Sequence, residues 1–198
     1  MPPDRDVAAF EARARDYEGG WLGRMHHQIS ERTADLVVAT DPDVRRLLDV
    51  GCGTGYLLRL LAERYPDAEL AGIDPAPSMI GVAAGSTVDD RVGFVVGSVE
   101  GLPCSDGEFD LVVATTSFDH WADQEQGLRE CARVLRPGGR LVLVDQFSPW
   151  LAPTLLFGRR GKARTERRCA RLLDAAGFVS IGWHGVYAAI IRAVVATT

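Results

Sequence analysis

The sequence has no uninterrupted apolar run long enough to cross a bilayer. Its best candidate, AAIIRAVVA, is short and contains Arg192. The first residues, MPPDRDVAAFEARARD, are charged throughout and lack the apolar core of a secretory signal. Four scattered cysteines form no C-x-x-C pair, so we expect buried free thiols in a reducing compartment. These absences predict a cytoplasmic protein without a membrane span.

The sequence also has fewer positively than negatively charged residues. It contains 22 Lys and Arg and 27 Asp and Glu, which gives a formal net charge of −5. This balance disfavours a protein that is held to nucleic acid by long-range charge. Hydrophobic residues make up 46% of the chain, as in ordinary soluble domains. No repeat, low-complexity tract or linker is visible, so we expect one domain over residues 1–198.

Apolar segments alternate with helical patterns along the chain. Strands are expected to end at Val50 and to cover AELAGID, VGFVVGS, FDLVVATT, RLVLVDQF, FVSIGWH and AIIRAVVAT. Helices are expected over residues 7–18, 28–39 and 56–64, from Ser78, from a cap at Asp123 to Leu135 (where RPGG ends the helix), and up to Ala176. Continuous apolar strands between helices predict a doubly wound, mainly parallel, seven-stranded α/β sheet. Because the connection GVYA is too short for a crossover helix, the last strand should run antiparallel.

The stretch LLDVGCGTGYLL, residues 47–58, places three glycines between a strand and a helix. In doubly wound sheets, ligands bind in the crevice beyond the strand ends, so Gly51, Gly53 and Gly55 are expected to line a ligand crevice. The alternative is that they only permit a tight turn. No Gly-Lys-Ser/Thr follows, as a phosphate loop requires, and the spacing does not match the dinucleotide pattern G-x-G-x-x-G.

Two acidic residues narrow the choice of ligand. Asp49 precedes the glycines, where a carboxylate would repel a pyrophosphate and attract an ammonium group. Asp74 ends the second strand, where a carboxylate can accept hydrogen bonds from a ribose diol, although it could instead cap the helix that follows. A nucleoside that carries an amine and no phosphates fits both positions, and S-adenosylmethionine (SAM) is such a ligand.

Three segments carry a family resemblance: LLDVGCGTGYLLRLLAERYPDAELAGIDPAPSMI, VGFVVGSVEGLPCSDGEFDLVVATTSFDHW and LRECARVLRPGGRLVLVDQF. Together they resemble class I SAM-dependent methyltransferases of the type 11, ubiquinone/menaquinone-methyltransferase-like family. The resemblance implies a Rossmann-like core over residues 45–198 and an N-terminal helical lid over residues 1–40. It also implies SAM as cofactor, a small-molecule methyl acceptor as partner, and leaves a homodimer open.

The resemblance assigns cofactor contacts residue by residue. The expected cofactor-binding residues are Tyr17, Asp49, Gly51, Cys52, Gly53, Gly55, Asp74, Pro75, Met79, Ser98, Val99 and Thr115. Asp49 and the glycine backbone would hold the methionine part, Asp74 the ribose, and Pro75 and Met79 the adenine. Relatives usually have Gly-Asp-Ala/Val-Glu where this chain reads GSVE, and that Asp contacts the adenine amine. Ser98 can still accept a hydrogen bond, but it lacks the charge-assisted strength of a carboxylate, ~1 kcal/mol, unless another acceptor compensates.

Methyl transfer from a sulfonium needs alignment, exclusion of water and, for hydroxyl or amine acceptors, a base. His120, in ATTSFDHW, is the candidate base, and its alternative role is packing at the crevice rim beside Trp121. Asp119 is expected to cap the following turn. His26 and His27 have no carboxylate or cysteine at ligand spacing, so we assign no metal.

Other possibilities remain open at this stage. Tyr17, with GGWLGRMHHQ in the lid, could reach the methionine carboxylate or be an ordinary core residue. GRRGKARTERR, residues 158–168, would suit an acidic acceptor or a solvated helix start. The chain could also be a catalytically silent SAM-binding or partner-binding domain. A nicotinamide-dependent (NAD) oxidoreductase is disfavoured by Asp49 and the glycine spacing.

Overall fold

A seven-stranded sheet forms the centre of the computed structural model, which describes residues 5–147, 165–188 and 190–198. The strands are β1 (Arg46–Val50), β2 (Glu69–Asp74), β3 (Val92–Val96), β4 (Phe109–Thr115), β5 (Leu135–Gln146), β6 (Ser180–Tyr187) and β7 (Ile191–Thr197). Their order across the sheet is β3-β2-β1-β4-β5-β7-β6. β7 runs antiparallel to both of its neighbours, and the other pairings are parallel. The predicted fold class and the antiparallel last strand are confirmed.

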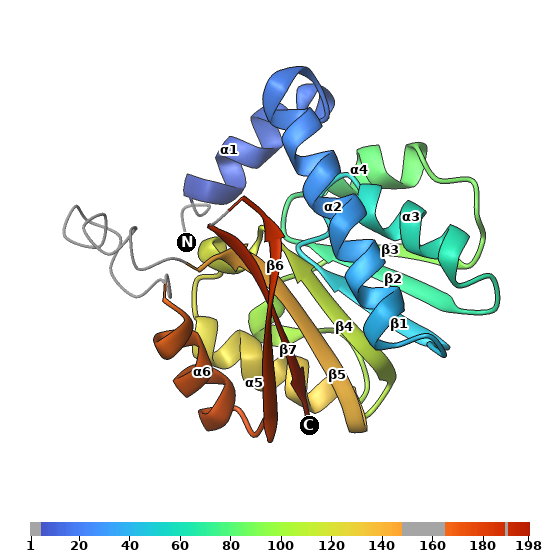
Figure 1. Ribbon diagram of the computed structural model, residues 1–198. Coiled ribbons are helices and arrows are strands. Elements are labelled where there is room, and N and C mark those ends of the chain that lie inside the picture. Colours follow the sequence, from blue (N-terminus) through green and yellow to red (C-terminus); the bar gives the residue numbers. More distant parts are fainter. Residues whose placement is uncertain (1–4, 148–164, 189) are drawn as a thin grey trace.

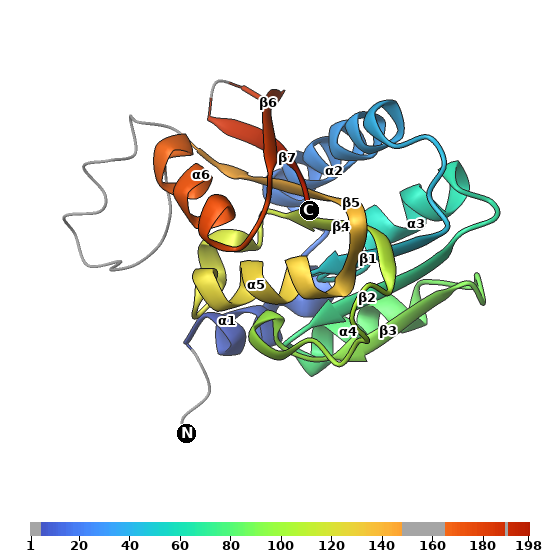
Figure 2. The same ribbon diagram turned by 90° about the horizontal axis from the view of Figure 1, so that it is seen from below.

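Helices cover both faces of this sheet (Figures 1 and 2). They are α1 (Arg5–Arg13), α2 (Gly20–Thr40), α3 (Tyr56–Arg64), α4 (Pro77–Gly85), α5 (Gln124–Val134) and α6 (Glu166–Ala175), with short 3-10 turns η1 (Ala14–Asp16), η2 (Val99–Gly101) and η3 (Phe118–His120). In Figure 2, α2 and α3 lie on one side of the sheet and α5 and α6 on the other. None of the described helices is long and apolar enough to cross a membrane.

The continuous apolar runs of the central strands follow from this double coverage. Successive side chains of a strand point to opposite faces. In β4, Leu111 and Val113 join the core beneath α2 and α3, whereas Val112 and Ala114 join the core beneath α5. Both faces therefore exclude water, and each position of the strand is best filled by an apolar residue.

Three element boundaries differ from the sequence-based expectation. α1 ends at Arg13, and its chain continues as the 3-10 turn η1 rather than as a helix to residue 18. α2 begins at Gly20, so the segment GGWLGRMHH forms its first turns instead of separating two helices. Gly23 permits this, because a Cβ there would lie 2.1 Å from the carbonyl oxygen of Glu18. Only a glycine allows the backbone to approach so closely.

The third difference concerns RPGG, which was expected to end α5. The helix ends at Val134, but β5 starts at once with Leu135, so RPGG lies within the strand. Gly138 adopts φ +78°, and the pairing of β4 with β5 shifts register between Phe109 and Leu111. The glycine therefore serves an irregular start of the strand rather than a helix terminus.

Asp123 caps α5 as predicted, and this cap can be tested. Its Oδ1 accepts hydrogen bonds from the backbone N–H groups of Glu125 (3.1 Å) and Gln126 (3.0 Å). We predict that Asp123→Ala lowers the free energy of unfolding by about 1 kcal/mol, because these N–H groups lose their acceptor. Urea denaturation provides the measurement, and Asp123→Asn, which keeps an acceptor oxygen, is the matched control. Equal losses in both variants would contradict the cap.

Candidate functional site

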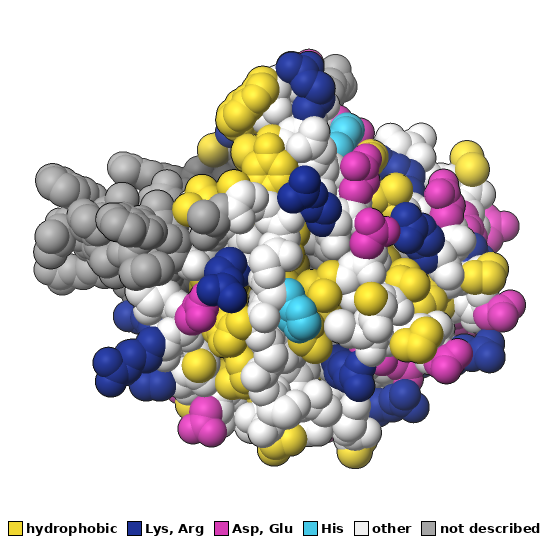
Figure 3. All heavy atoms as spheres, viewed as in Figure 1, with side chains coloured by type: hydrophobic (Ala, Val, Ile, Leu, Met, Phe, Trp, Pro, Cys, Tyr) yellow, Lys and Arg dark blue, Asp and Glu magenta, His cyan; other side chains and the backbone are white. Residues whose placement is uncertain are grey.

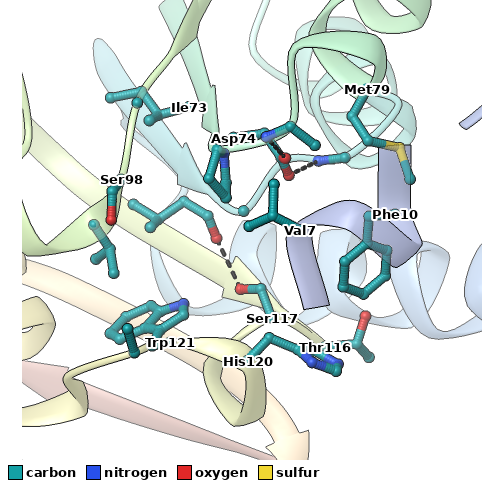
Figure 4. Close-up of a pocket in the computed structure, with 18 of the residues that line it drawn as sticks. Val7, Phe10, Ile73, Asp74, Met79, Ser98, Thr116, Ser117, His120 and Trp121 are labelled. Carbon is teal, nitrogen blue, oxygen red and sulfur yellow. Dashed lines mark hydrogen bonds between the residues drawn. The ribbon is translucent and has the colours of Figure 1, made fainter. Parts of the chain in front are cut away.

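A cavity of about 310 Å³ opens where the parallel strands β1, β2, β3 and β4 end (Figure 4). The loops that follow these strands line it with residues 51 and 53, 74–76, 97–100 and 115–117. Val7 and Phe10 of α1 close it from the N-terminal segment. A smaller cavity of about 60 Å³ adjoins it. Tyr17, Gly51, Gly53, Thr115 and Thr116 border both cavities.

The glycine loop separates the two cavities with bare backbone. Gly51, Gly53 and Gly55 have φ values of +74°, +54° and +76°, a region that strains other residues. A Cβ on Gly51 would lie 2.4 Å from that of Ser117, and one on Gly55 would lie 2.9 Å from the ring of Phe94. Gly53 has open space beside it. The tight turn thus explains Gly51 and Gly55, while Gly53 leaves room against the cavities.

Asp74 is the acid of the larger cavity. Its Oδ2 accepts a hydrogen bond from the Gly53 N–H (2.9 Å), and its Oδ1 accepts one from the Ala76 N–H (2.9 Å). The carboxylate therefore ties the glycine loop to Ala76, the residue before α4, but it does not cap that helix, whose N-terminus has no side-chain cap. Burial nevertheless raises the pKa of Asp74. Because each carboxylate oxygen has a further lone pair, both can still accept a ligand hydroxyl.

Asp49 is the acid of the smaller cavity and is almost wholly buried, with 2% of its surface exposed. Burial, followed by the negative charge of Asp74, raises its pKa to about 8. Two buried carboxylates thus flank the glycine loop, and a cation beside them would favour their ionised forms. A pyrophosphate in the same place would add repulsion.

The segment GSVE, residues 97–100, lines the larger cavity and contributes the carboxylate of Glu100, although it lacks the Asp that relatives have. The Ser98 hydroxyl donates a hydrogen bond to Oε2 of Glu100, and both residues line the larger cavity. Oε1 of Glu100 accepts from the backbone N–H groups of Ala122 (2.9 Å) and Asp123 (3.1 Å). Glu100 is therefore held in place, and it polarises the Ser98 hydroxyl as a hydrogen-bond acceptor.

The turn after β4 has unusual backbone geometry. Thr116 adopts φ +52°, which is rare for a β-branched residue and often marks a functional site. The next hydroxyl, on Ser117, donates to the carbonyl oxygen of Val50 (2.9 Å) and binds this turn to β1. His120 follows in η3, and its ring centroid lies 5.0 Å from that of Phe10 at 88°. Figure 4 shows Phe10, Thr116 and His120 gathered at one end of the cavity.

Asp145, at the end of β5, holds this turn from beneath. Its Oδ2 accepts from the backbone N–H of Asp119 (3.0 Å). Asp119 itself lies buried within η3, and its expected role as a cap of the following turn stays a prediction. Both His120 and Asp119 thus sit on a turn that is anchored to the sheet.

The N-terminal segment contributes aromatic side chains. Tyr17 is half-buried, with its ring centroid 6.1 Å from Phe10 and 5.1 Å from His26. His27 stacks on Tyr56, with 3.8 Å between the ring centroids, and its Nε2 lies 3.4 Å from Oε2 of Glu18. Within residues 5–147, 165–188 and 190–198, no group of three or more His, Cys, Asp or Glu side chains could hold a metal ion.

Most of the residues that the sequence predicted for the site line one of the two cavities. The larger cavity is lined by Tyr17, Gly51, Gly53, Asp74, Pro75, Met79, Ser98, Val99, Thr115 and His120, and the smaller adds Asp49 and Cys52. Gly55 lines neither cavity. Sequence reasoning missed Val7, Phe10 and Glu100, although GSVE already contained Glu100. It expected the side chains after Thr115 to face the cofactor without naming Thr116 and Ser117, which also line the larger cavity. Of the basic stretch 158–168, residues 158–164 lie outside the described residues.

The raised pKa of Asp49 predicts a stability that depends on pH. The pKa of Asp49 is about 8 in the folded protein and 3.8 ordinarily. Its contribution to the free energy of unfolding is therefore fully present below about pH 4 and is lost as the pH rises towards 8. Asp49→Asn removes this loss. We therefore predict that Asp49→Asn unfolds at a higher temperature than the unmutated protein, by a margin that grows from pH 5 to pH 8. Thermal melts across that range provide the measurement, and a margin independent of pH would contradict the buried carboxyl.

Comparisons with known proteins agree with this geometry. A family model described as "Methyltransferase domain" matches residues 48–143. A malonyl-[acyl-carrier protein] O-methyltransferase of Geobacter sulfurreducens is 37% identical over 189 residues, covering 87% of this chain and 69% of the relative. A demethylmenaquinone methyltransferase of Thermus thermophilus is 41% identical over 120 residues, covering 60% of this chain and 53% of the relative. The chain spans about half to two thirds of the length of the curated relatives it matches.

A solved structure shows the same fold at lower identity. A methyltransferase of Haloferax volcanii, in complex with the Trm112 methyltransferase activator, has a TM-score of 0.80 and 21% identity, covering 95% of this chain and 96% of that chain. The family model and the Geobacter relative extend the likeness from fold to sequence. The chain therefore belongs to the class I SAM-dependent methyltransferases of the type 11, methyltransferase-domain family.

Proposed function

We propose that the chain binds SAM across the two cavities and transfers its methyl group to a small-molecule acceptor. The larger cavity suits the adenosine part, with Asp74 accepting from the ribose hydroxyls and with Met79 and Pro75 against the adenine. The smaller cavity suits the amino-acid part, with Asp49 beside the ammonium group. The observation that carries this proposal is the pair of buried carboxylates around a side-chain-free loop.

The same observation argues against a nicotinamide dinucleotide. The pyrophosphate of such a ligand would lie against the glycine loop, where its negative charge would face Asp74 and would further oppose the ionisation of the buried Asp49. Such like-charge contacts are most unfavourable where the groups are buried. A ligand that carries a positive charge at this point would instead be attracted to the two carboxylates.

When bound, SAM supplies a methyl group that its sulfonium already activates. The chain then has to orient the acceptor and keep water away. Val7 and Phe10 cover the larger cavity, and Phe10 packs on His120. We assign His120 as the proton acceptor for a hydroxyl or amine nucleophile, since it lines the larger cavity and a neutral imidazole has a nitrogen that can accept a proton.

The proposed acceptor is a small molecule rather than nucleic acid. On the face shown in Figure 3, Lys and Arg side chains are interspersed with Asp and Glu, so that face has no field of one sign. The relatives named above are called malonyl-[acyl-carrier protein] O-methyltransferase and demethylmenaquinone methyltransferase. We also propose a cytoplasmic location, which the buried free thiols of Cys52, Cys131 and Cys169 support.

Calorimetric titration with S-adenosylhomocysteine (SAH) tests the proposed binding, with NADH as the control ligand. We expect heat and a thermal shift with SAH and neither with NADH. Transfer of a labelled methyl group from SAM to a panel of phenols, amines and thiols then tests for catalysis. Binding of SAH without transfer to any acceptor would favour a silent binding domain. No binding of SAH would overturn the proposal.

The Ser98–Glu100 pair leads to a further prediction, which concerns recognition of the adenine amine. Because Glu100 polarises the Ser98 hydroxyl, we expect this pair to replace the family's Asp as acceptor for the adenine amine. Ser98→Ala should weaken SAH binding by roughly threefold to tenfold, the value of one such hydrogen bond, whereas Ser98→Asp should preserve it. S-inosylhomocysteine, which lacks the amine, should bind the unmutated protein and Ser98→Ala equally. Equal losses for both ligands would contradict a contact with the amine.

A further inference from the structure

β3 forms one edge of the sheet and leaves a row of backbone groups facing outwards. Among the described strands it pairs with β2 alone (Figure 2). The carbonyl oxygen of Arg91 and the N–H of Gly97 both bond to backbone groups of β2 (2.9 Å and 3.1 Å). Because alternate residues of a strand direct their backbone groups to opposite sides, Phe94 and Val96 present theirs to the outside. Such a row of donors and acceptors is a template for another strand.

Apolar side chains flank this open edge. Val95 and Val96 of β3 are each 49% exposed, and Val88, in the loop before the strand, is fully exposed. The surrounding sequence is also free of charge, because residues 75–88 and 92–99 contain no Asp, Glu, Lys or Arg. α4, which packs against β3, belongs to the first of these segments. β3 therefore lacks the charged residues and prolines that usually protect a free edge.

The opposite edge of the sheet, formed by β6, is protected. The pairing of β6 with β7 shifts register between Gly185 and Tyr187, so the strand is irregular there. Arg32 of α2 donates a hydrogen bond to the carbonyl oxygen of Val186 (2.9 Å), and its guanidinium lies 5.2 Å from the ring centroid of Tyr187. The pairing of β3 with β2, in contrast, runs over the whole of β3 without a shift. Of the two edges, β3 is thus the one that remains regular and open.

Hydrogen bonding at this edge suits a second copy of the same strand. If two β3 strands run antiparallel with their Phe94 residues opposite each other, each Phe94 N–H meets the carbonyl oxygen of the other Phe94. In the same register, each Val96 N–H meets the carbonyl oxygen of the other copy's Val92. The N–H of Val92 is already used, because it donates to Asp89 within its own chain (3.0 Å). Self-pairing therefore satisfies each outward N–H of the strand.

Charge favours the same register. It brings residues 89–91 of one copy, which read DDR, opposite residues 97–99 of the other, which read GSV. Asp89 and Arg91 also pair within their own chain, with 2.5 Å between Oδ2 and Nη2. No like charges then lie directly opposite each other, an arrangement that would destabilise paired strands. Sliding one strand by two residues would instead bring Asp90 opposite Glu100.

We propose that two copies of this chain pair through β3, antiparallel and about a two-fold axis, so that their sheets join into one. The interface is isologous, since each copy contributes the same edge. Val95 and Val96 pack on opposite faces of the joined sheet, because successive side chains of a strand point to opposite sides. This surface is separate from the proposed cofactor site, since Val88, Val95 and Val96 line neither cavity. The pairing is also independent of methyl transfer.

Sedimentation equilibrium of the full chain over roughly 1 to 100 μM tests the pairing, because the population of a dimer depends on protomer concentration. We expect twice the 21.5 kDa mass of one chain at the upper end. Val96→Pro removes one outward N–H from each copy and should weaken the dimer by roughly tenfold or more. Val95→Lys should also weaken it, because a charge on an edge strand opposes pairing. Far-ultraviolet circular dichroism checks that each variant is folded.

The matched control is Val179→Lys. Val179 is an equally uncharged, exposed residue (80%) directly before β6, at the other edge of the sheet. We expect this variant to dimerise like the unmutated protein. Dissociation of the dimer by Val179→Lys would overturn the proposal, since the effect of an added charge would then not be specific to β3.

Hydrogen exchange resolved by residue locates the interface. The amides of Phe94 and Val96 should be protected in the dimer and should exchange roughly tenfold or more faster in Val95→Lys, whereas the amide of Gly97, which bonds to β2, should stay protected in both. A dimer that survives both Val96→Pro and Val95→Lys would overturn the proposal, because its interface would lie elsewhere. A chain that stays monomeric over the whole concentration range would overturn it too, and would leave the edge to a strand of another protein.

Discussion

The burial of two carboxylates on either side of a loop without side chains is the constraint that organises this molecule. Asp74 is held by backbone N–H groups of Gly53 and Ala76, so its position is fixed by the loop it supports. Asp49 has a pKa of about 8, because burial and the charge of Asp74 both oppose its ionisation. Ionisation of the two carboxylates is unfavourable while the site is empty, and it becomes favourable when a cation binds beside them. The site therefore favours a ligand that combines an ammonium or sulfonium with a ribose.

The fold supplies this constraint through its parallel strands. β1, β2 and β4 end at one edge of the sheet, and the residues that follow them meet around the same cavities. Both faces of the sheet are covered, so Asp49, in β1 between β2 and β4, is buried rather than at the surface. α1 then closes the larger cavity with Phe10 and Val7 (Figure 4).

Local patterns in the sequence predicted the elements that local physics determines. α3 spans residues 56–64 as expected, because its leucines recur at helical spacing, and Asp123 caps α5. The start of α2 was wrong, since it depends on the contact of Gly23 with Glu18. The Ser98–Glu100 pair and the packing of Phe10 on His120 also escaped prediction. Each requires a side-chain orientation or a distant neighbour that no local pattern encodes. Only the three-dimensional fold brings α1 over η3.

A crystal structure of the protein with SAH tests the central claim most directly. The account predicts that the ribose hydroxyls lie within hydrogen-bond distance of Asp74, with the amino-acid part across the glycine loop and its ammonium towards Asp49. SAH seated elsewhere, or with its amino-acid end directed away from Asp49, would contradict the account.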